Sequence, residues 1–232
     1  MEMMVDETSA HKAHLQEYFD TLGFERWSAI YDGHSELSSV RQSVREGHAE
    51  MLSQAQVWLQ QTCEQGGTLL DVGCGTGLFS VAQAQQGFDV TAVDIAPRMV
   101  TATVQSAECA DVAGRIEAQV GDIESTQGHY DVVVCFDVLI HYPPQVVEVF
   151  CQHLAERTQQ TLLLTYAPYN ALLAGLHWIG GMFPRSQRRT EIQMIRDHDI
   201  DRILSRAQMR VVRRQRVSCG FYHVMLLQAV PN

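Results

Sequence analysis

A glycine-rich loop at residues 71–77, with the sequence DVGCGTG, constrains the fold of this chain more than any other stretch. It follows an apolar run at residues 69–72, which predicts a buried parallel strand, and precedes residues 78–86, whose apolar positions recur at helical spacing. Alternating glycines let a ligand lie directly against the backbone. A second strand at residues 89–93 ends in Asp94, where folds of this type bind a ribose. The stretch therefore predicts half of a nucleotide-binding unit.

The spacing of the glycines separates two kinds of cofactor. A dinucleotide fingerprint requires G-x-G-x-x-G, whereas the third glycine here, Gly77, comes one position early. The string resembles the first motif of class I S-adenosylmethionine-dependent methyltransferases. In that motif the acid before the loop, here Asp71, faces the amino-acid part of a cofactor that has no pyrophosphate to repel. A dinucleotide site and a plain strand turn remain the alternatives.

Length and composition fit one domain with additions. A chain of 232 residues with 46% hydrophobic content can bury a substantial core. No run of about 18 apolar residues predicts a membrane span, and residues 1–12 lack the basic start and apolar centre of a signal peptide. We therefore expect a cytoplasmic protein that is associated with a membrane at most peripherally.

Charge and metal-ligating residues exclude other classes. The net charge of -10 argues against general nucleic-acid binding, although residues 185–216 contain ten arginines and four acids. This basic region indicates either a solvated helix and strand edge or a surface that attracts an anion. The six cysteines are irregularly spaced, which is typical of reduced thiols. The histidines show no metal-ligand spacing, so we expect no metal bound by the protein.

Strands alternate with helices along the rest of the chain, which predicts an α/β fold. We expect a Rossmann-like, doubly wound, mostly parallel seven-stranded sheet with an antiparallel C-terminal hairpin. Strands are expected at residues 69–72, 89–93, 115–120, 130–136 and 161–166, and the hairpin at 210–215 and 221–228. Helices are expected at residues 46–62, 97–109 and 144–156. Ligands bind outside the carboxyl ends of such strands, so the octet DVLIHYPP at residues 137–144 should border the active site.

Two segments have no place in that sheet. A helix at residues 10–19 and the aromatic residues after it are expected to cover the cofactor crevice as a lid, or else to pack as a stray N-terminal helix. We therefore divide the chain into an N-terminal helical lid segment, residues 1–62, and a methyltransferase domain, residues 63–232, with a helical insertion at about 168–208. The apolar stretch 169–184 inside the insertion should pack on the sheet, line a hydrophobic pocket or rest on a membrane surface.

Several segments together resemble the magnesium protoporphyrin IX methyltransferase family. They are YFDTLGFERWSAIY, SVREGH, DVLIHYPP, TYAPYNALLAGLHWIGGMFPRSQR and GFYHVMLLQA, and they follow in order over nearly the whole chain. The resemblance implies transfer of a methyl group from S-adenosyl-L-methionine to a propionate carboxylate of magnesium protoporphyrin IX. The product would be the monomethyl ester of magnesium protoporphyrin IX, an intermediate of chlorophyll or bacteriochlorophyll biosynthesis in photosynthetic organisms. The resemblance also adds the porphyrin-binding subunit of magnesium chelatase as a candidate partner.

The resemblance extends to individual residues. The family's proposed catalytic pair corresponds to Tyr31 and His141, which would hold the propionate by hydrogen bonds. In this fold Asp94 is expected to bind the cofactor ribose, and Asp122 the adenine amino group. The alternatives are lid packing for Tyr31, a structural turn histidine for His141 and an ordinary turn acid for Asp122. The residues expected to bind the cofactor are Arg45, Asp71, Gly73, Cys74, Gly75, Gly77, Asp94, Ile95, Asp122, Ile123 and Phe136.

The implied acceptor sets what the site has to supply. A propionate with a reference pKa of about 4 is already ionised at neutral pH, so alignment and exclusion of water matter more than a strong base. Two other functions fit the glycine motif. A methyltransferase acting on another small molecule would not need a porphyrin-sized apolar pocket, and a non-catalytic pigment-delivery protein would bind the cofactor without turnover.

Overall fold

The computed structural model describes residues 2–31, 38–63, 66–169 and 192–232, and in the first of these ranges it describes the side chains of residues 9–28. Within this part the sheet has the strand order β3-β2-β1-β4-β5-β8-β7, and β6 pairs with β5 off this path. The strands are β1 (Gly67–Val72), β2 (Phe88–Asp94), β3 (Ile116–Val120), β4 (Tyr130–Cys135), β5 (Thr158–Pro168), β6 (Met194–Ile195), β7 (Met209–Cys219) and β8 (Tyr222–Pro231).

Strand directions confirm the predicted doubly wound sheet. The pairs from β3 to β5 are all parallel, whereas β8 runs antiparallel to β5, and β7 antiparallel to β8. The main path contains the seven predicted strands, with bounds that differ by a few residues. The two-residue β6 is an addition that no periodicity could reveal. The strand order reverses between β1 and β4, which is where a fold of this kind opens a ligand crevice.

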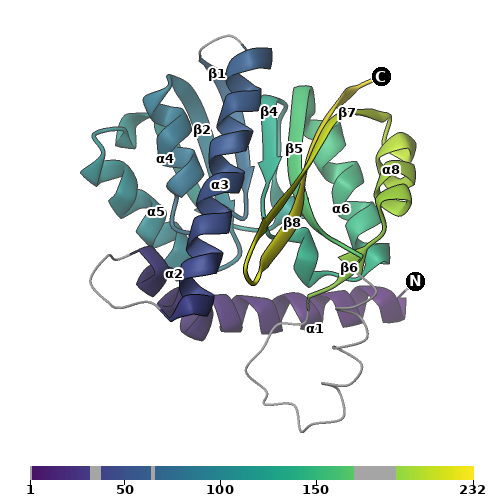
Figure 1. Ribbon diagram of the computed structural model, residues 1–232, viewed down its shortest axis with the longest axis horizontal. Helices are drawn as coiled ribbons and strands as arrows, with labels where there is room; N and C mark the ends of the chain where they lie inside the picture. The colour runs from purple at the N-terminus through teal and green to yellow at the C-terminus, as the bar shows by residue number, and fades with distance from the viewer. Residues whose placement is uncertain (1, 32–37, 64–65, 170–191) are drawn as a thin grey trace, which may run out of the picture.

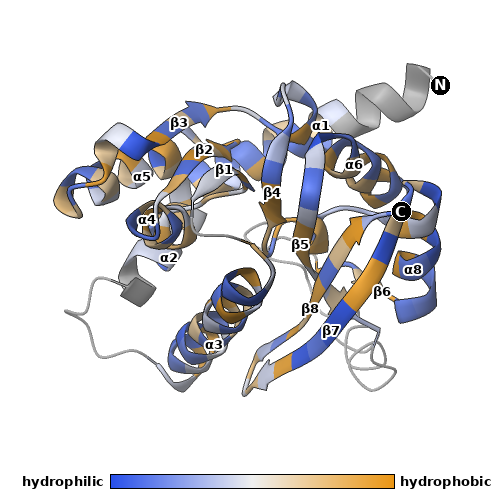
Figure 2. Cartoon of the chain, turned by 90° about the horizontal axis from the view of Figure 1, so that it is seen from above, coloured by the Kyte–Doolittle hydropathy of each residue, from blue (hydrophilic) through white to orange (hydrophobic). Residues whose placement is uncertain are grey.

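Helices cover both faces of the sheet (Figures 1 and 2). They are α1 (Glu2–Tyr18), the π-helical η1 (Phe19–Gly23), α2 (Phe24–Tyr31), α3 (Ser39–Thr62), α4 (Leu78–Gln85), α5 (Pro97–Cys109), α6 (Pro144–Arg157) and α8 (Asp197–Arg206). Short 3-10 turns are η2 (Ala113–Arg115), η3 (Ile123–Ser125) and η4 (Leu139–His141). Among these helices, none is long and apolar enough to cross a membrane.

The core consists of two clusters, one on each face of the sheet. Along β4, Val132 and Val134 pack in the cluster with α3 and α4, while Val133 and Cys135 pack in the cluster with α6 and α8. All four side chains are fully buried. Burial on both faces explains why this strand is uniformly apolar in sequence, as expected for a central parallel strand.

Helix α3 begins earlier than predicted. We expected Arg41 and Arg45 to precede a helix starting at residue 46, but the helix starts at Ser39, and Ser38 caps it by accepting from the Arg41 N–H at 3.4 Å. The first turns are largely exposed, so they lack the apolar periodicity on which the prediction depended. Helix α8 was not predicted as a separate helix, although it falls inside the helical insertion that was predicted at about residues 168–208.

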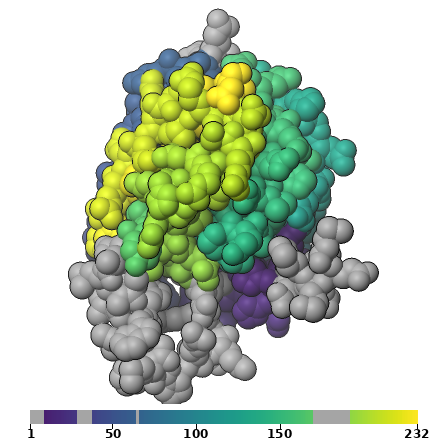
Figure 3. Space-filling view, turned by 90° about the vertical axis from the view of Figure 1, so that its right-hand side faces the viewer, coloured from purple at the N-terminus to yellow at the C-terminus, as the bar shows by residue number. Residues whose placement is uncertain are grey.

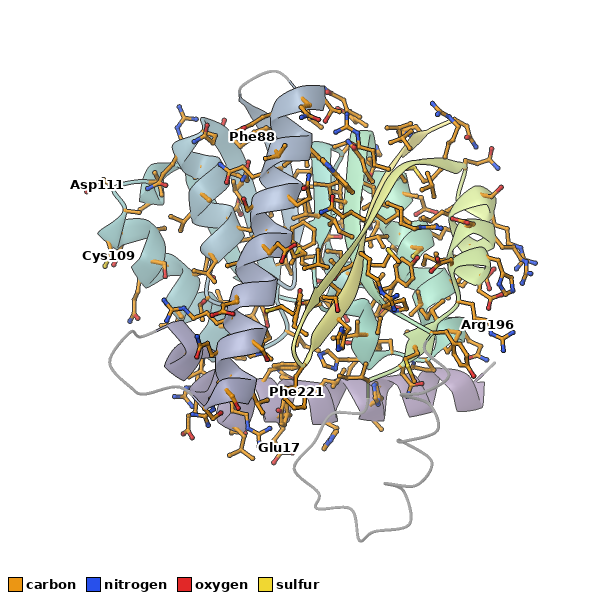
Figure 4. All side chains as sticks on the ribbon, in the orientation of Figure 1. Glu17, Phe88, Cys109, Asp111, Arg196 and Phe221 are labelled. Carbon is orange, nitrogen blue, oxygen red and sulfur yellow. The ribbon has the colours of Figure 1, made fainter. Side chains whose placement is uncertain are left out.

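The N-terminal helices lie across one edge of the sheet. Figure 1 shows α1 running beneath the carboxyl ends of the parallel strands, and α2, which follows η1, contacts α3. The turn between β7 and β8, where Figure 4 labels Phe221, reaches the same end of the sheet, and the Phe221 N–H donates to Ser43 Oγ on α3 there. This arrangement closes the edge at which the glycine loop emerges.

Candidate functional site

A cavity of about 140 Å³ lies at the carboxyl ends of the parallel strands. Its walls are formed by the glycine loop after β1, the ends of β2 and β4, the turn after β3, and side chains from α1, α2 and α3. The cavity therefore occupies the point at which the strand order reverses, as the sequence predicted for the ligand site.

The glycine loop has two kinds of glycine. Gly73, Gly75 and Gly77 have φ angles of 78°, 56° and 82°, which favour glycine. A Cβ at Gly73 would lie 2.1 Å from the Val138 side chain, and one at Gly77 would lie 3.0 Å from Thr103, so these two are required for packing. In the part of the chain that the structure describes, a Cβ at Gly75 would meet nothing within 4 Å. Gly75 therefore leaves open the space in which a ligand can approach the backbone.

Asp94 fixes this loop to the end of β2. Its Oδ2 accepts from the Gly75 N–H at 3.0 Å, and its Oδ1 accepts from the Ala96 N–H at 2.9 Å. The side chain is buried, and burial raises the pKa of the carboxyl above its ordinary value, although both backbone hydrogen bonds counteract this effect. Asp94 thus shapes the loop in addition to lining the cavity.

Asp71 is the acid at the end of β1. It is almost fully buried, and Ser80 in the first turns of α4 donates to its Oδ2 at 2.6 Å. Burial raises the pKa of Asp71 to about 7, even though the Ser80 hydrogen bond acts in the opposite direction. A buried carboxyl that titrates near neutral pH is well suited to face a positively charged ligand.

The charge of the cavity indicates what it can hold. Asp71, Asp94, Asp122 and Asp137 line it, and no lysine or arginine does so among the residues that the structure describes. Asp122 is paired with Lys12, but Asp71, Asp94 and Asp137 have no lysine or arginine partner among the described residues. Carboxylates of this kind repel a pyrophosphate and attract a positive ligand. The donor set therefore fits S-adenosylmethionine, which carries a sulphonium and an ammonium group, and argues against a dinucleotide.

His141 also lines the cavity, at the end of η4. Its ring packs against Phe19 with centroids 5.2 Å apart, and its Nδ1 is buried without a hydrogen-bond partner among the described residues. Burial, with a smaller contribution from His11, lowers the pKa of His141 to about 4. The imidazole is therefore neutral at pH 7, so it can exchange a hydrogen bond with an acceptor but is a weak base.

Helix α1 is attached to both sides of the cavity. The His11 ring lies 2.8 Å from the backbone carbonyl of His141, to which its Nε2 can donate. Lys12 bonds Asp122 Oδ2 at 2.8 Å and also pairs with Glu124. Burial opposes ionisation of Asp122, but the Lys12 hydrogen bond and charge outweigh it and lower the pKa of the carboxyl. An adenine amino group at Asp122 would therefore share this carboxylate with Lys12.

Most of the predicted site residues are brought together by the fold. Arg45 is exposed on α3 and does not line the cavity, and Gly77 supports the loop as the N-cap of α4 without lining it. Tyr31 is the last residue of α2, and its side chain lies outside the described part, as does the apolar stretch from residue 170 to 184. The predicted residues that line the cavity are Asp71, Gly73, Cys74, Gly75, Asp94, Ile95, Asp122, Ile123, Phe136 and His141.

Sequence reasoning missed other residues of the cavity. His48 lines it from α3, with its ring 5.3 Å from that of Trp27. It precedes the buried Met51 and Ala55 at helical spacing, and this pattern was a usable signal for an inward-facing side chain. Asp137 was included only as part of the octet after β4. For Lys12, no local pattern pointed to a partner 110 residues away.

Three arginines in the described part of the basic region are paired with acids. Figure 3 shows the side of the molecule that α8 and β7 cover. Arg206 pairs with Glu148 at 2.7 Å, and Arg214 pairs with Asp201. Arg202 contacts Asp199 at 3.1 Å. These pairs favour the interpretation of a solvated helix and strand edge for residues 192–216. In the described ranges, His, Cys, Asp and Glu side chains form no group of three that could hold a metal.

The fold and the cavity together define a class I S-adenosylmethionine-dependent methyltransferase. Residues 69–160 match the general methyltransferase domain model, and residues 135–231 match the model of the magnesium-protoporphyrin IX methyltransferase C-terminus. The chain belongs to the magnesium protoporphyrin IX methyltransferase family, because curated members are more than 30% identical to it over most of their length.

Three comparisons illustrate this similarity. The magnesium-protoporphyrin O-methyltransferase of Synechocystis sp. is 34% identical over 221 residues, covering 94% of this chain and 96% of the relative. The chloroplastic magnesium protoporphyrin IX methyltransferase of Arabidopsis thaliana is 34% identical over 94% of this chain and 70% of the relative. The crystal structure of the Synechocystis enzyme with bound SAH has a TM-score of 0.86 and 32% identity, covering 95% of this chain and 100% of that one.

Proposed function

We propose that this chain transfers a methyl group from S-adenosyl-L-methionine to a propionate carboxylate of magnesium protoporphyrin IX, giving the monomethyl ester. One observation supports this acceptor above others: the similarity to the named relatives spans about 94% of the chain. It includes residues 135–231, most of which lie outside the general methyltransferase model. The second half of the chain therefore resembles this family specifically, and not only the class of S-adenosylmethionine-dependent methyltransferases.

On this proposal the cofactor side of the cavity is formed by the glycine loop and its acids. Asp94 would bind the ribose hydroxyls with the lone pairs that its backbone contacts leave free, and the open backbone at Gly75 would lie against the ligand. Asp71 would face the positively charged methionine part. When bound, the cofactor supplies an electrophilic methyl group on a sulphonium. The protein residues supply orientation and a low-dielectric surrounding.

The acceptor side needs donors more than a base. The neutral His141 lines the cavity, and its buried Nδ1 has no hydrogen-bond partner among the described residues. In the proposal this nitrogen donates to or accepts from the acceptor carboxyl, according to its tautomer, when that group reaches it. In the proposal Tyr31 adds a second donor. Leu15 and Phe19 from the N-terminal helices line the cavity with apolar surface, which excludes water from the carboxylate. Their combined role is to align the carboxylate oxygen with the transferred methyl group.

The N-terminal helices act in this proposal as a lid, in a segment of residues 1–62 attached to the methyltransferase domain of residues 63–232. A planar porphyrin cannot enter a site that is already closed over the cofactor, so in this proposal a wall of the cavity moves. Helix α1 is held over the cavity by the contacts of His11 and Lys12, which a swing of the helix would break.

The decisive experiment measures S-adenosylhomocysteine release with magnesium protoporphyrin IX as acceptor, and identifies the porphyrin ester by chromatography. The proposal expects ester formation with this substrate and none with small carboxylic acids of equal concentration. Turnover of smaller acceptors with no porphyrin ester would favour the alternative small-molecule methyltransferase. Cofactor binding without any turnover would favour a pigment-delivery protein.

Two finer parts of the proposal concern partners. The porphyrin-binding subunit of magnesium chelatase would hand over a poorly soluble pigment directly, and contact with a membrane surface would be peripheral. Co-purification with that chelatase subunit and sedimentation with anionic vesicles test these parts separately. If neither binds the protein in the presence or absence of the porphyrin, both parts are wrong, while the proposed reaction is unaffected.

A further inference from the structure

Asp137 has a backbone conformation that few residues adopt. It lies two residues after the end of β4, lines the cavity, and has a φ of 56°, in the left-handed region. Non-glycine residues are uncommon there, and such conformations gather at functional sites, where the surrounding structure maintains them. The conformation lets the chain leave β4 with this carboxylate in the cavity wall.

Two hydroxyl groups fix the carboxylate. Its Oδ1 accepts from Thr165 Oγ1 on β5 at 3.0 Å, and its Oδ2 accepts from the Tyr222 hydroxyl on β8 at 2.8 Å. The Asp137 N–H donates to the same Thr165 oxygen at 2.7 Å. Donors from two neighbouring strands therefore hold the side chain in one orientation, which is the form of support that a binding residue needs.

The position of Tyr222 is itself built into the fold. The absence of a side chain at Gly47 makes room for its ring, because a Cβ there would lie 2.5 Å from Tyr222 Cδ1. The Phe221 N–H donates to Ser43 Oγ at 3.1 Å, which attaches the hairpin turn to α3 (Figure 4). The hydroxyl that reaches Asp137 is thus positioned by the contacts of the β7–β8 hairpin with α3.

The location of Asp137 defines what it can recognise. The next residue, Val138, packs against Gly73, so Asp137 lies beside the part of the loop that faces the amino-acid end of the cofactor in this class. No lysine or arginine lines the cavity among the described residues, and Asp137 accepts from two neutral hydroxyls. Burial lowers the pKa of His48, which also lines the cavity, although the charge of Asp137 acts in the opposite direction, so the neutral imidazole does not form an ion pair with this carboxylate. The carboxylate is therefore available to a positive charge on a ligand.

We propose that Asp137, oriented by Thr165 and Tyr222, recognises the positive charge at the methionine end of S-adenosylmethionine. The inference rests on the proposed function only through the cofactor site. Both the sulphonium and the ammonium group carry such a charge. S-adenosylhomocysteine retains only the ammonium, and 5′-methylthioadenosine has neither, so the three ligands separate the two sources.

Titration calorimetry of the full chain with these three ligands tests the proposal. Asp137→Asn removes the charge and keeps the shape, and Asp137→Gly removes the side chain at a φ that glycine favours, so both variants are compatible with the backbone. We expect the dissociation constant of S-adenosylmethionine to rise about tenfold in both, as for the loss of a charge-assisted contact. The constant of 5′-methylthioadenosine should stay within about twofold of the wild type.

S-adenosylhomocysteine identifies the group. A rise of about tenfold for it as well assigns the ammonium to Asp137, and an unchanged constant assigns the sulphonium. The matched control is Asp131→Asn, the same change near the other end of β4, where the carboxylate accepts from the Thr68 N–H at 2.8 Å away from the cavity. Equal weakening of all three ligands, or of none, overturns the inference. The wild-type protein reports separately on whether the cofactor site exists.

Discussion

The replacement Asp94→Ala tests whether the cofactor ribose is bound where the sequence predicted. In the structure this carboxylate accepts two backbone N–H groups, from Gly75 at 3.0 Å and from Ala96 at 2.9 Å. The substitution therefore removes any bond to the ribose and also the support of the glycine loop. A hydrogen bond to a charged group contributes about 1.5–3 kcal/mol, so the dissociation constant of the cofactor should rise at least about tenfold.

The two consequences of Asp94→Ala can be measured separately. Two N–H groups in a buried site lose their partner, and each unsatisfied group costs about 1–3 kcal/mol, so we expect the free energy of unfolding without ligand to fall by about 2 kcal/mol or more. Urea titration measures this loss. Calorimetry at 25 °C with S-adenosylhomocysteine measures the affinity.

A ligand change isolates the ribose contact. The wild-type protein should bind a 2′,3′-dideoxy analogue of S-adenosylhomocysteine more weakly than the parent compound, and Asp94→Ala should abolish most of that difference. Asp89→Ala is the control, because Asp89 is an exposed acid on the same strand that pairs with Arg115 at 2.9 Å. If Asp94→Ala preserves the preference for the hydroxylated ligand, Asp94 acts only on the loop and the ribose lies elsewhere.

Three further predictions follow from the same cavity. His141→Ala and Tyr31→Phe should each lower the single-turnover rate constant about tenfold or more, while the affinity for the cofactor stays within a few-fold of the wild type. A wild-type rate that rises with a pKa of 6 to 7, and a loss of this titration in His141→Gln, would contradict the orienting role. The pKa of Asp71 is raised to about 7, and a cationic ligand favours the ionised form of this carboxyl. Calorimetry should therefore show proton release on binding, and tighter S-adenosylmethionine binding as the pH rises through 7, and Asp71→Asn should remove both effects. An affinity of the wild-type protein that does not change with pH would count against this charge contact. Lys12→Ala should release α1 from Asp122 and increase hydrogen exchange over residues 9–28 in the protein without ligand. A mobile lid would be contradicted if exchange were equal in the variant and the wild-type protein, and equal with and without the cofactor and porphyrin.

Local patterns were sufficient for the class of fold. The buried strands at residues 69–72 and 130–135 were visible as apolar runs, and Pro97 and Pro144 marked the starts of α5 and α6. Helix α3 was recognised only from its buried second half, because its exposed first turns carry no periodicity. The start of α3 was therefore missed because its first turns are exposed.

The part of the site that lies next to the predicted strands was also predictable from the sequence. The glycines of the loop, Asp71 and Asp94 occupy fixed positions relative to two strands, so their convergence follows from the parallel order of those strands. Arg45, which was expected to contact the cofactor, is exposed on α3 and is not part of the cavity lining, so its contact with the cofactor stays a prediction. The direction of a helical side chain depends on how the helix is rotated against the sheet, and the loop motif does not specify this rotation.

The sequence by itself determined the cofactor class, since a glycine loop between a strand and a helix creates its binding geometry from residues that are neighbours in the chain. Only the tertiary structure decided which distant side chains complete the cavity. Lys12 reaches Asp122 across 110 residues, and Tyr222 reaches Asp137 across 85. Such contacts depend on the relative placement of packed elements, which arises from the burial of whole helix and sheet faces, and no periodicity within one element encodes it.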